Sequence, residues 1–274
     1  MRSGHQAASS LTPEAMRSSL SSLIQGLISH DKLQEAFGYQ CVDEGTVAGI
    51  HGTSIEEYLQ IHAAIQVTSP LHDHLDELSD NELLTAVEVL HELVSDGVTG
   101  RHHDFCHCGW HYDTFSQEPA QILFRSTINK LLSRFGDKYI LTDSGSIELL
   151  LDEPASSLVH KELPGDVGDE IEHRIHRARE IFLAPSSDWD NRRVAIRELG
   201  DILESLRTRV REHLGRPDEQ ALFEILNNFG IRHLNDRQKT DYDKKVFLKW
   251  IFHVCLASIH ACLELNDHMT QNQE

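Results

Sequence analysis

The sequence predicts a mainly α-helical protein: a helical N-terminal region that carries a small β-hairpin, followed by a C-terminal up-and-down bundle of four helices. Three observations support this fold class. Apolar residues recur at helical spacing over most of the chain. Several of these segments begin with capping sequences. One pair of short apolar runs surrounds a Gly-containing turn, which is typical of a hairpin.

Capping signals place the helices of the N-terminal region. Thr12-Pro13 opens the first helix with a capping residue followed by a proline at the first helical position. Ser54–Glu57 and Ser79–Glu82 match the capping box, and each precedes an amphipathic run. A further helix is predicted over residues 118–135. In the segments 38–53 and 96–116 between these helices, apolar residues follow neither the spacing of a helix nor that of a strand. We therefore expect both segments to be irregular.

The predicted hairpin spans about residues 138–151. Its apolar runs are 138–142 and 146–151, and Gly145 lies in the turn between them. Because an isolated hairpin is only marginally stable, this one is expected to pack on helices or on further strands.

Residues 152–168 are rich in Pro, Gly and Ser and are interpreted as a linker. The predicted domains are therefore an acidic helical region, 1–160, and a helical bundle, 166–266. Short connections between the helices of the second domain favour an up-and-down bundle. Its helices are expected over 169–183, 188–214, 218–229 and 243–265.

The charge and composition of the chain limit what it can bind and where it is expected to act. The 274 residues carry a formal charge of −19, and residues 1–165, with 24 acidic against 9 basic side chains, account for −15 of it. This balance argues against a nucleic-acid-binding surface over the whole molecule and favours a partner protein for the acidic region. No signal peptide or long uncharged apolar run is apparent, so we expect a cytoplasmic protein without a membrane partner. Five cysteines, an odd number, are expected as reduced thiols.

The densest group of metal-ligand residues lies between Arg101 and His111. Cys106 and Cys108 are spaced C-x-C, and Cys41 and His51 are the upstream candidates for completing a site. One interpretation is a zinc site at residues 102–111. The interpretation preferred here is a polar loop whose Trp110 and Tyr112 pack into the core, so no metal and no cofactor are expected.

Arginines gather on the predicted helix 188–214, among them Arg192, Arg193 and Arg197. They indicate either a solvated face paired with nearby glutamates or a local groove that contacts an RNA backbone.

The stretch 227–245 separates two apolar helices and is itself strongly polar. Arg232 suits a phosphate oxygen, and His233 titrates near neutrality and can transfer a proton. Lys239 and Tyr242 add a cation and a phenolic donor. These four residues are the catalytic candidates for cleavage of a phosphodiester without metal. The alternative is a structural turn in which Arg232 pairs with nearby aspartates and Asp243 caps the last helix.

The chain resembles the HEPN superfamily and bacterial proteins of the abortive-infection type. The four-helix layout after Asp169 carries this resemblance, together with the segments NNFGIRHLNDRQKTDYD and FLKWIFHVCLASIHACLEL. In the first part, the SDNE start at Ser79 and the segments CGWHYDTF and FGDKYILTDSGSIELL are also similar to such proteins.

The resemblance implies a homodimeric helical domain of phage-defence or toxin-type systems that binds RNA and, in many members, cleaves it without metal. The family motif is an Arg, a polar residue and a later His. Arg232 and His233 match its beginning, but the later position reads Arg-Gln-Lys. Either His233 takes over the proton transfer, or the domain is a non-catalytic relative that binds RNA, nucleotide or a partner. A non-catalytic protein-interaction or regulatory module is therefore the alternative function.

Overall fold

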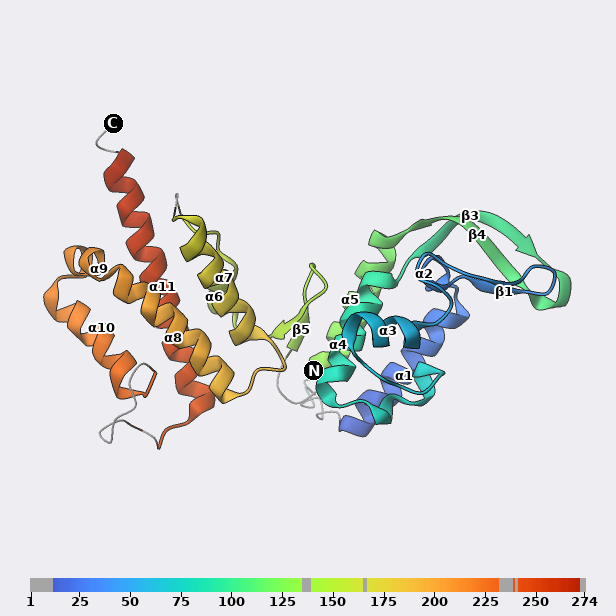
Figure 1. Ribbon diagram of the computed structural model, residues 1–274, viewed down its shortest axis with the longest axis horizontal. Helices are drawn as coiled ribbons and strands as arrows, with labels where there is room; N and C mark the ends of the chain where they lie inside the picture. Colours follow the sequence, from blue (N-terminus) through green and yellow to red (C-terminus); the bar gives the residue numbers. More distant parts are fainter. Residues whose placement is uncertain (1–11, 135–138, 165–166, 232–238, 240, 272–274) are drawn as a thin grey trace, which may run out of the picture. The chain divides into compact units, whose positions relative to one another are not determined.

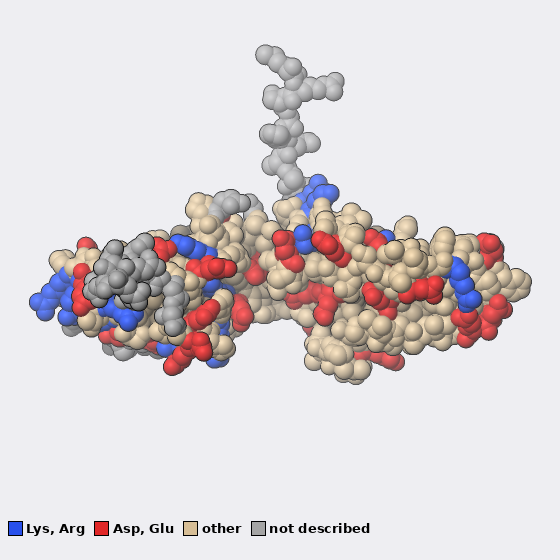
Figure 2. All heavy atoms as spheres, turned by 90° about the horizontal axis from the view of Figure 1, so that it is seen from above, with Lys and Arg blue, Asp and Glu red and all other residues tan. Residues whose placement is uncertain are grey.

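The computed structural model describes residues 12–134, 139–164, 167–231, 239 and 241–271 (Figure 1). These residues form a mainly helical protein with three small two-stranded antiparallel sheets, which confirms the predicted fold class at that level. The chain divides into two compact units, Met1–Leu149 and Leu150–Glu274. In Figure 2 acidic side chains predominate over the visible face of the first unit, whereas both signs are interspersed over the second.

Four helices enclose the core of the N-terminal unit: α1 (Pro13–Ser29), α3 (Ile55–Ala63), α4 (Asp80–Leu93) and α5 (Gln117–Leu132). Helix α4 packs against α3 and α5. Their apolar stripes meet in one cluster, in which each fully buried Leu or Ile contributes about 2 kcal/mol. Ile24, Leu59, Leu90 and Ile128 represent the four helices in this cluster.

Each predicted capping residue accepts a backbone hydrogen bond, but the capping box predicted at Ser54–Glu57 is only half formed, because the Ser54 hydroxyl donates to Glu56 at 2.6 Å. Thr12 accepts a hydrogen bond from the Ala15 backbone N–H at 3.3 Å, and Ser54 accepts one from Glu57 at 3.3 Å. Ser79 and Glu82 make both bonds of the capping box. Short 3-10 turns at Leu71–Asp73 and Leu75–Glu77 lead into α4.

The hairpin predicted at 138–151 is confirmed as β5 (Tyr139–Leu141) paired with β6 (Ile147–Leu149). It packs on helices, as expected. The Asn129 side chain of α5 bonds both backbone groups of Leu141, at 2.7 and 3.0 Å, and a Glu88 carboxylate oxygen of α4 accepts from the Ile147 N–H at 2.6 Å.

The expectation that 38–53 and 96–116 are irregular is wrong. The first segment contains β1 (Tyr39–Cys41) and β2 (Gly45–Val47), and follows the short helix α2 (Gln34–Phe37). The second is a hairpin of two long strands, β3 (Asp96–His103) and β4 (Gly109–Ser116), joined by the 3-10 turn Phe105–His107.

The C-terminal unit is built from helices only, as far as it is described. Helix α8 (Trp189–Ser205) packs against α7 (Asp169–Leu183) and α11 (Lys244–Gln271). Phe182 of α7 and Phe252 of α11 stack with ring centroids 3.9 Å apart. Helix α6 (Glu153–His160) lies within the predicted linker and packs on α11, so it belongs to this unit.

The predicted helix 188–214 is two helices. The chain breaks at Leu206 and continues as α9 (Arg207–Leu214), and Gly215 then leads into α10 (Arg216–Asn228). Arg207 at the break pairs with Glu204 and with the buried carboxylate of Glu219. The pair with Glu219 links α9 to α10, and the pair with Glu204 links α9 to α8.

One buried polar contact links α7 to α11. The Arg179 guanidinium contacts His260 Nε2 at 3.0 Å and donates to the Lys161 carbonyl oxygen at 3.0 Å. Because the arginine is the donor, His260 Nε2 acts as an acceptor and the imidazole is neutral. Burial, Arg179 and then Lys161 lower the pKa of His260 from 6.5 to about 4.

This shift predicts acid-sensitive stability of the C-terminal unit. The unfolded chain protonates His260 below its ordinary pKa of 6.5, whereas the folded unit resists protonation until about pH 4. The contribution of neutral His260 to the unfolding free energy is therefore complete above pH 6.5 and is lost as the pH falls toward 4. We expect wild type to lose roughly 2 kcal/mol more unfolding free energy than His260→Gln between about pH 7 and pH 4.5, measured by hydrogen exchange in α7 and α11. An equal loss of unfolding free energy in wild type and His260→Gln would contradict this role of His260.

Candidate metal centre

Four side chains, one from β1 and three from the β3–β4 hairpin, converge at the turn end of that hairpin. Cys41 ends β1, His103 ends β3, Cys108 directly precedes β4, and His111 lies within β4. Their metal-binding atoms all lie within 4.8 Å of one another. Among the residues that the structure describes, this is the one group of three or more His, Cys, Asp or Glu side chains with such geometry.

The distances suit a tetrahedral zinc ion. Cys108 Sγ lies 3.2 Å from His111 Nε2, and Cys41 Sγ lies 3.6 Å from His103 Nδ1. Zn–S bonds of about 2.3 Å and Zn–N bonds of about 2.0 Å place neighbouring ligands of a tetrahedron roughly 3.3–3.8 Å apart. The donors therefore need only small shifts to bind one ion, and two Cys with two His is a ligand set that zinc prefers.

The surroundings orient both histidines. Asp43 approaches the second ring nitrogen of His103, with Oδ2 3.2 Å from Nε2, which leaves Nδ1 directed at the sulfur atoms. A carboxylate on the outer nitrogen is the usual support of a metal-binding histidine. Tyr39 stacks on His111 at 4.0 Å and fixes the plane of that ring.

Burial of these polar groups also favours a bound cation. His111 is only 3% exposed, and its Nδ1 has no hydrogen-bond partner among the described residues. Burial, and then the neighbouring Cys41 and Asp43, raise the pKa of the Cys108 thiol. A divalent ion at the centre of the four donors favours the thiolate form of the cysteines, because it binds the sulfur atoms. The same ion offsets the free-energy cost of burying the imidazole.

The local sequence shapes the turn that brings the donors together. Cys106 adopts φ +52° and Gly109 adopts φ +91°, which reverses the chain between His103 and His111. On the other side of the site, Gly38 precedes β1 with φ +71°, where an added Cβ would lie 1.7 Å from the Val47 carbonyl oxygen. Only glycine fits there, so Gly38 fixes where β1 and Cys41 lie.

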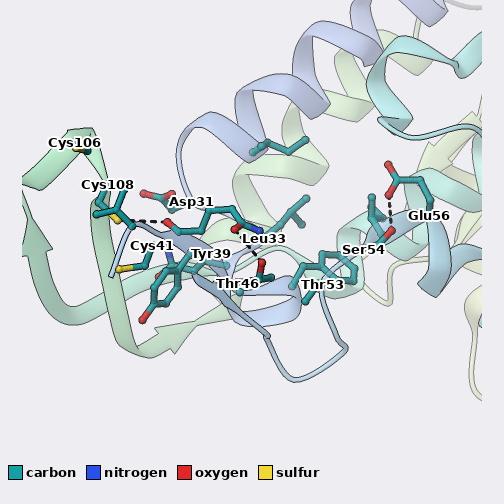
Figure 3. Close-up of a pocket in the computed structure, with 17 residues that line it drawn as sticks. Asp31, Leu33, Tyr39, Cys41, Thr46, Thr53, Ser54, Glu56, Cys106 and Cys108 are labelled. Atoms are coloured by element: carbon teal, nitrogen blue, oxygen red, sulfur yellow. Dashed lines mark hydrogen bonds between the residues drawn. The ribbon is translucent and has the colours of Figure 1, made fainter. Parts of the chain in front are cut away.

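An open cleft of about 770 Å³ adjoins the centre (Figure 3). Cys41 and Cys108 lie at one end of the view, and Ser54 and Glu56 lie at the other. Cys108 also contacts the Gln40 carbonyl oxygen in this cleft, at 3.4 Å.

The preferred interpretation of residues 101–111 as a polar loop is wrong. The segment is part of a hairpin, and Trp110 is 44% exposed instead of packed in the core. The expectation of no metal rested on the C-x-C spacing and on the lack of a second Cys/His pair after it. Cys106 is exposed and lies outside the donor group. The informative spacing was Cys108-x2-His111. Of the two upstream candidates Cys41 joins the site, whereas His51 packs on Tyr58.

The catalytic candidates of the C-terminal unit are described only in part. Arg232 and His233 lie outside the described residues. Lys239 and Tyr242 both approach Phe229 just after α10: Lys239 Nζ lies 5.2 Å from its ring, and the Tyr242 hydroxyl donates to its carbonyl oxygen at 3.2 Å. Burial raises the pKa of Tyr242.

The arginines predicted to bind RNA have specific intramolecular partners. Arg192 is only 8% exposed and its guanidinium lies over the rings of Trp189 and Phe182. Arg193 donates to the Gly230 carbonyl oxygen at 2.7 Å, and Arg197 to that of Ile231 at 2.9 Å. Arg193 and Arg197 thus hold the backbone that leads into Arg232, whereas Arg192 packs between helices.

Comparison with protein-family models, curated proteins and solved structures finds no match to this chain. Within the described helices one segment, Lys244–Leu265, is long and apolar enough to cross a membrane, and 50% of its most apolar window is buried. Leu248, Ile251 and Phe252 on this segment are fully buried, and the helix packs against α8. Packing within the unit therefore accounts for the buried half of the segment, whereas Val246, Trp250 and Leu265 are exposed.

Proposed function

We propose that the N-terminal unit is a zinc-binding module in which Cys41, His103, Cys108 and His111 hold one Zn²⁺ that fixes a protruding hairpin for interaction with a partner. The observation that carries this proposal is the convergence of the four donor atoms within 4.8 Å. Four protein ligands complete a tetrahedral shell and leave no position for substrate or water. The ion is therefore structural, and the chemistry of the site is cross-linking of the chain.

The two hairpins need such a cross-link. Strands β1 and β2 have three residues each, and a two-stranded sheet is only marginally stable in water. Beside the four donors, the side chain of Gln34 links α2 to β4 through bonds to Trp110 and Tyr112, at 2.8 and 2.7 Å. A structural zinc site contributes on the order of 10 kcal/mol to folding, enough to fix this region.

Zinc content and hydrogen exchange test the proposal together. Purified wild-type protein should contain one zinc ion per chain by elemental analysis. Cys108→Ser should weaken zinc binding more than about a hundredfold, because loss of a ligand costs more than loss of an outer partner. Chelation should increase amide exchange in β3 and β4 while α4 stays protected.

Cys106→Ser is the matched control, since Cys106 is a nearby exposed cysteine outside the donor group. It should keep zinc and hairpin protection at wild-type levels. Zinc-free wild-type protein with a protected hairpin would contradict the proposal.

We propose as a second candidate that the C-terminal unit is a HEPN-like, up-and-down bundle of α7, α8, α10 and α11 that binds RNA as a homodimer in a phage-defence or toxin-type protein. The hydrogen bonds of Arg193 and Arg197 to Gly230 and Ile231 favour it. They anchor the backbone directly before Arg232 and His233, as a positioned phosphate-binding pair requires. Arg232 is assigned to phosphate and His233 to proton transfer, with Lys239 and Tyr242 in support.

Substitution tests this second candidate. Arg232→Ala and His233→Ala should each abolish RNA cleavage or growth toxicity while the helical content stays at the wild-type level. Arg177→Ala, which removes an exposed arginine on α7, is the control and should leave both activities unchanged. Wild-type protein that neither binds nor cleaves RNA would remove the second candidate and leave the zinc module as the proposed function.

A further inference from the structure

Four aromatic rings form a continuous row along the β3–β4 hairpin. His102 meets Trp110 edge to face at 5.3 Å, Trp110 stacks on Tyr112 at 5.6 Å with an angle of 11°, and Tyr112 meets Phe115 at 6.1 Å. We call His102, Trp110, Tyr112 and Phe115 the aromatic row.

Trp110 and Tyr112 lie on the face of the hairpin opposite to the metal donors. Side chains alternate between the two faces of a strand, so these residues point away from the face of His111. His102 pairs with Trp110 across the strands and shares its face. Gly97 makes room for the row, since an added Cβ there would lie 2.3 Å from the Tyr112 ring.

The row is accessible. Trp110 is 44% exposed, and Phe105 in the adjoining turn is 63% exposed. Neither belongs to the core cluster of the unit. Large apolar groups gathered on a surface hairpin are typical of an interaction site, and packing of the unit does not account for them.

Charge around the row indicates the class of its partner. Residues 96–118 contain four carboxylates and a single Lys or Arg, which is Arg101. Arg101 pairs with Glu44 and Asp96 pairs with Lys32, so these two charges are already compensated and three carboxylates remain. Asp104 is highly exposed and contacts His102 at the end of the row, at 2.7 Å. This surface repels phosphate groups and attracts cations.

We propose that the aromatic row is a docking surface for an Arg- or Lys-rich segment of a partner protein. A guanidinium or ammonium group stacks over the face of Trp110 and is attracted by the ring electrons. The Asp104 carboxylate accepts a charge-assisted hydrogen bond from the same or a neighbouring side chain. The inference rests on the proposed zinc module, because the metal on the opposite face orders the strands that present the rings.

Fluorescence anisotropy with full-length protein tests the proposal, using a short labelled peptide of alternating Arg and Gly as the probe. Trp110→Ala should weaken peptide binding about tenfold, and Asp104→Asn should weaken it to a smaller extent. Added salt should weaken wild-type binding. Ile61→Ala removes an exposed apolar side chain from α3, outside the aromatic row, and should bind like wild type.

Zinc analysis of each variant separates this proposal from the proposed function. Trp110→Ala should keep wild-type zinc, since its side chain lies on the other face. Zinc-loaded wild type that does not bind the peptide, or Trp110→Ala that binds as well as Ile61→Ala, overturns the docking surface alone. Equal or tighter binding of an Asp-Gly peptide or single-stranded RNA overturns the cationic partner. Peptide binding by metal-free wild type overturns the link to zinc.

Discussion

In the N-terminal unit, the sulfur atoms of two cysteines and the ring nitrogens of two histidines lie within 4.8 Å of one another. The arrangement of the β1–β2 and β3–β4 hairpins depends on this constraint. Cys41 reaches the site from β1, whereas the other three donors come from the β3–β4 hairpin, far along the chain. Without a cation the same geometry buries polar groups and brings two potential thiolates together, which is unfavourable. With a cation it becomes a cross-link between distant segments, and one face of the hairpin is fixed while the opposite face stays available.

Local signals in the sequence predicted the elements that local physics stabilises. Ser79 and Glu82 mark the start of α4 through their mutual hydrogen bonds, and the apolar runs around Gly145 predict β5 and β6. The β3–β4 hairpin escaped prediction because its strands contain glycines and histidines at positions that apolar residues usually occupy. Its support comes from Gln34 and Cys41, which lie more than fifty residues earlier in the sequence.

The candidate metal centre was predictable only in part. Cys108-x2-His111 is visible as a spacing, but the choice of Cys41 over His51 depends on how β1 lies against the hairpin. In the C-terminal unit, the partners of the arginines likewise depend on tertiary structure that the sequence does not reveal. Arg193 and Arg197 look like surface charges in the sequence, yet they bond to carbonyl oxygens after α10, which is a tertiary contact. Sequence patterns identify such side chains without identifying their partners.

X-ray absorption at the zinc edge of the purified protein measures the type and distance of the ligands, and therefore tests whether the four side chains bind one zinc ion. We expect a four-coordinate ion with two sulfur ligands at about 2.3 Å and two nitrogen ligands at about 2.0 Å. A shell of oxygen and nitrogen alone, or one of four sulfur atoms, would contradict the assignment of Cys41, His103, Cys108 and His111 as the ligands of one zinc ion.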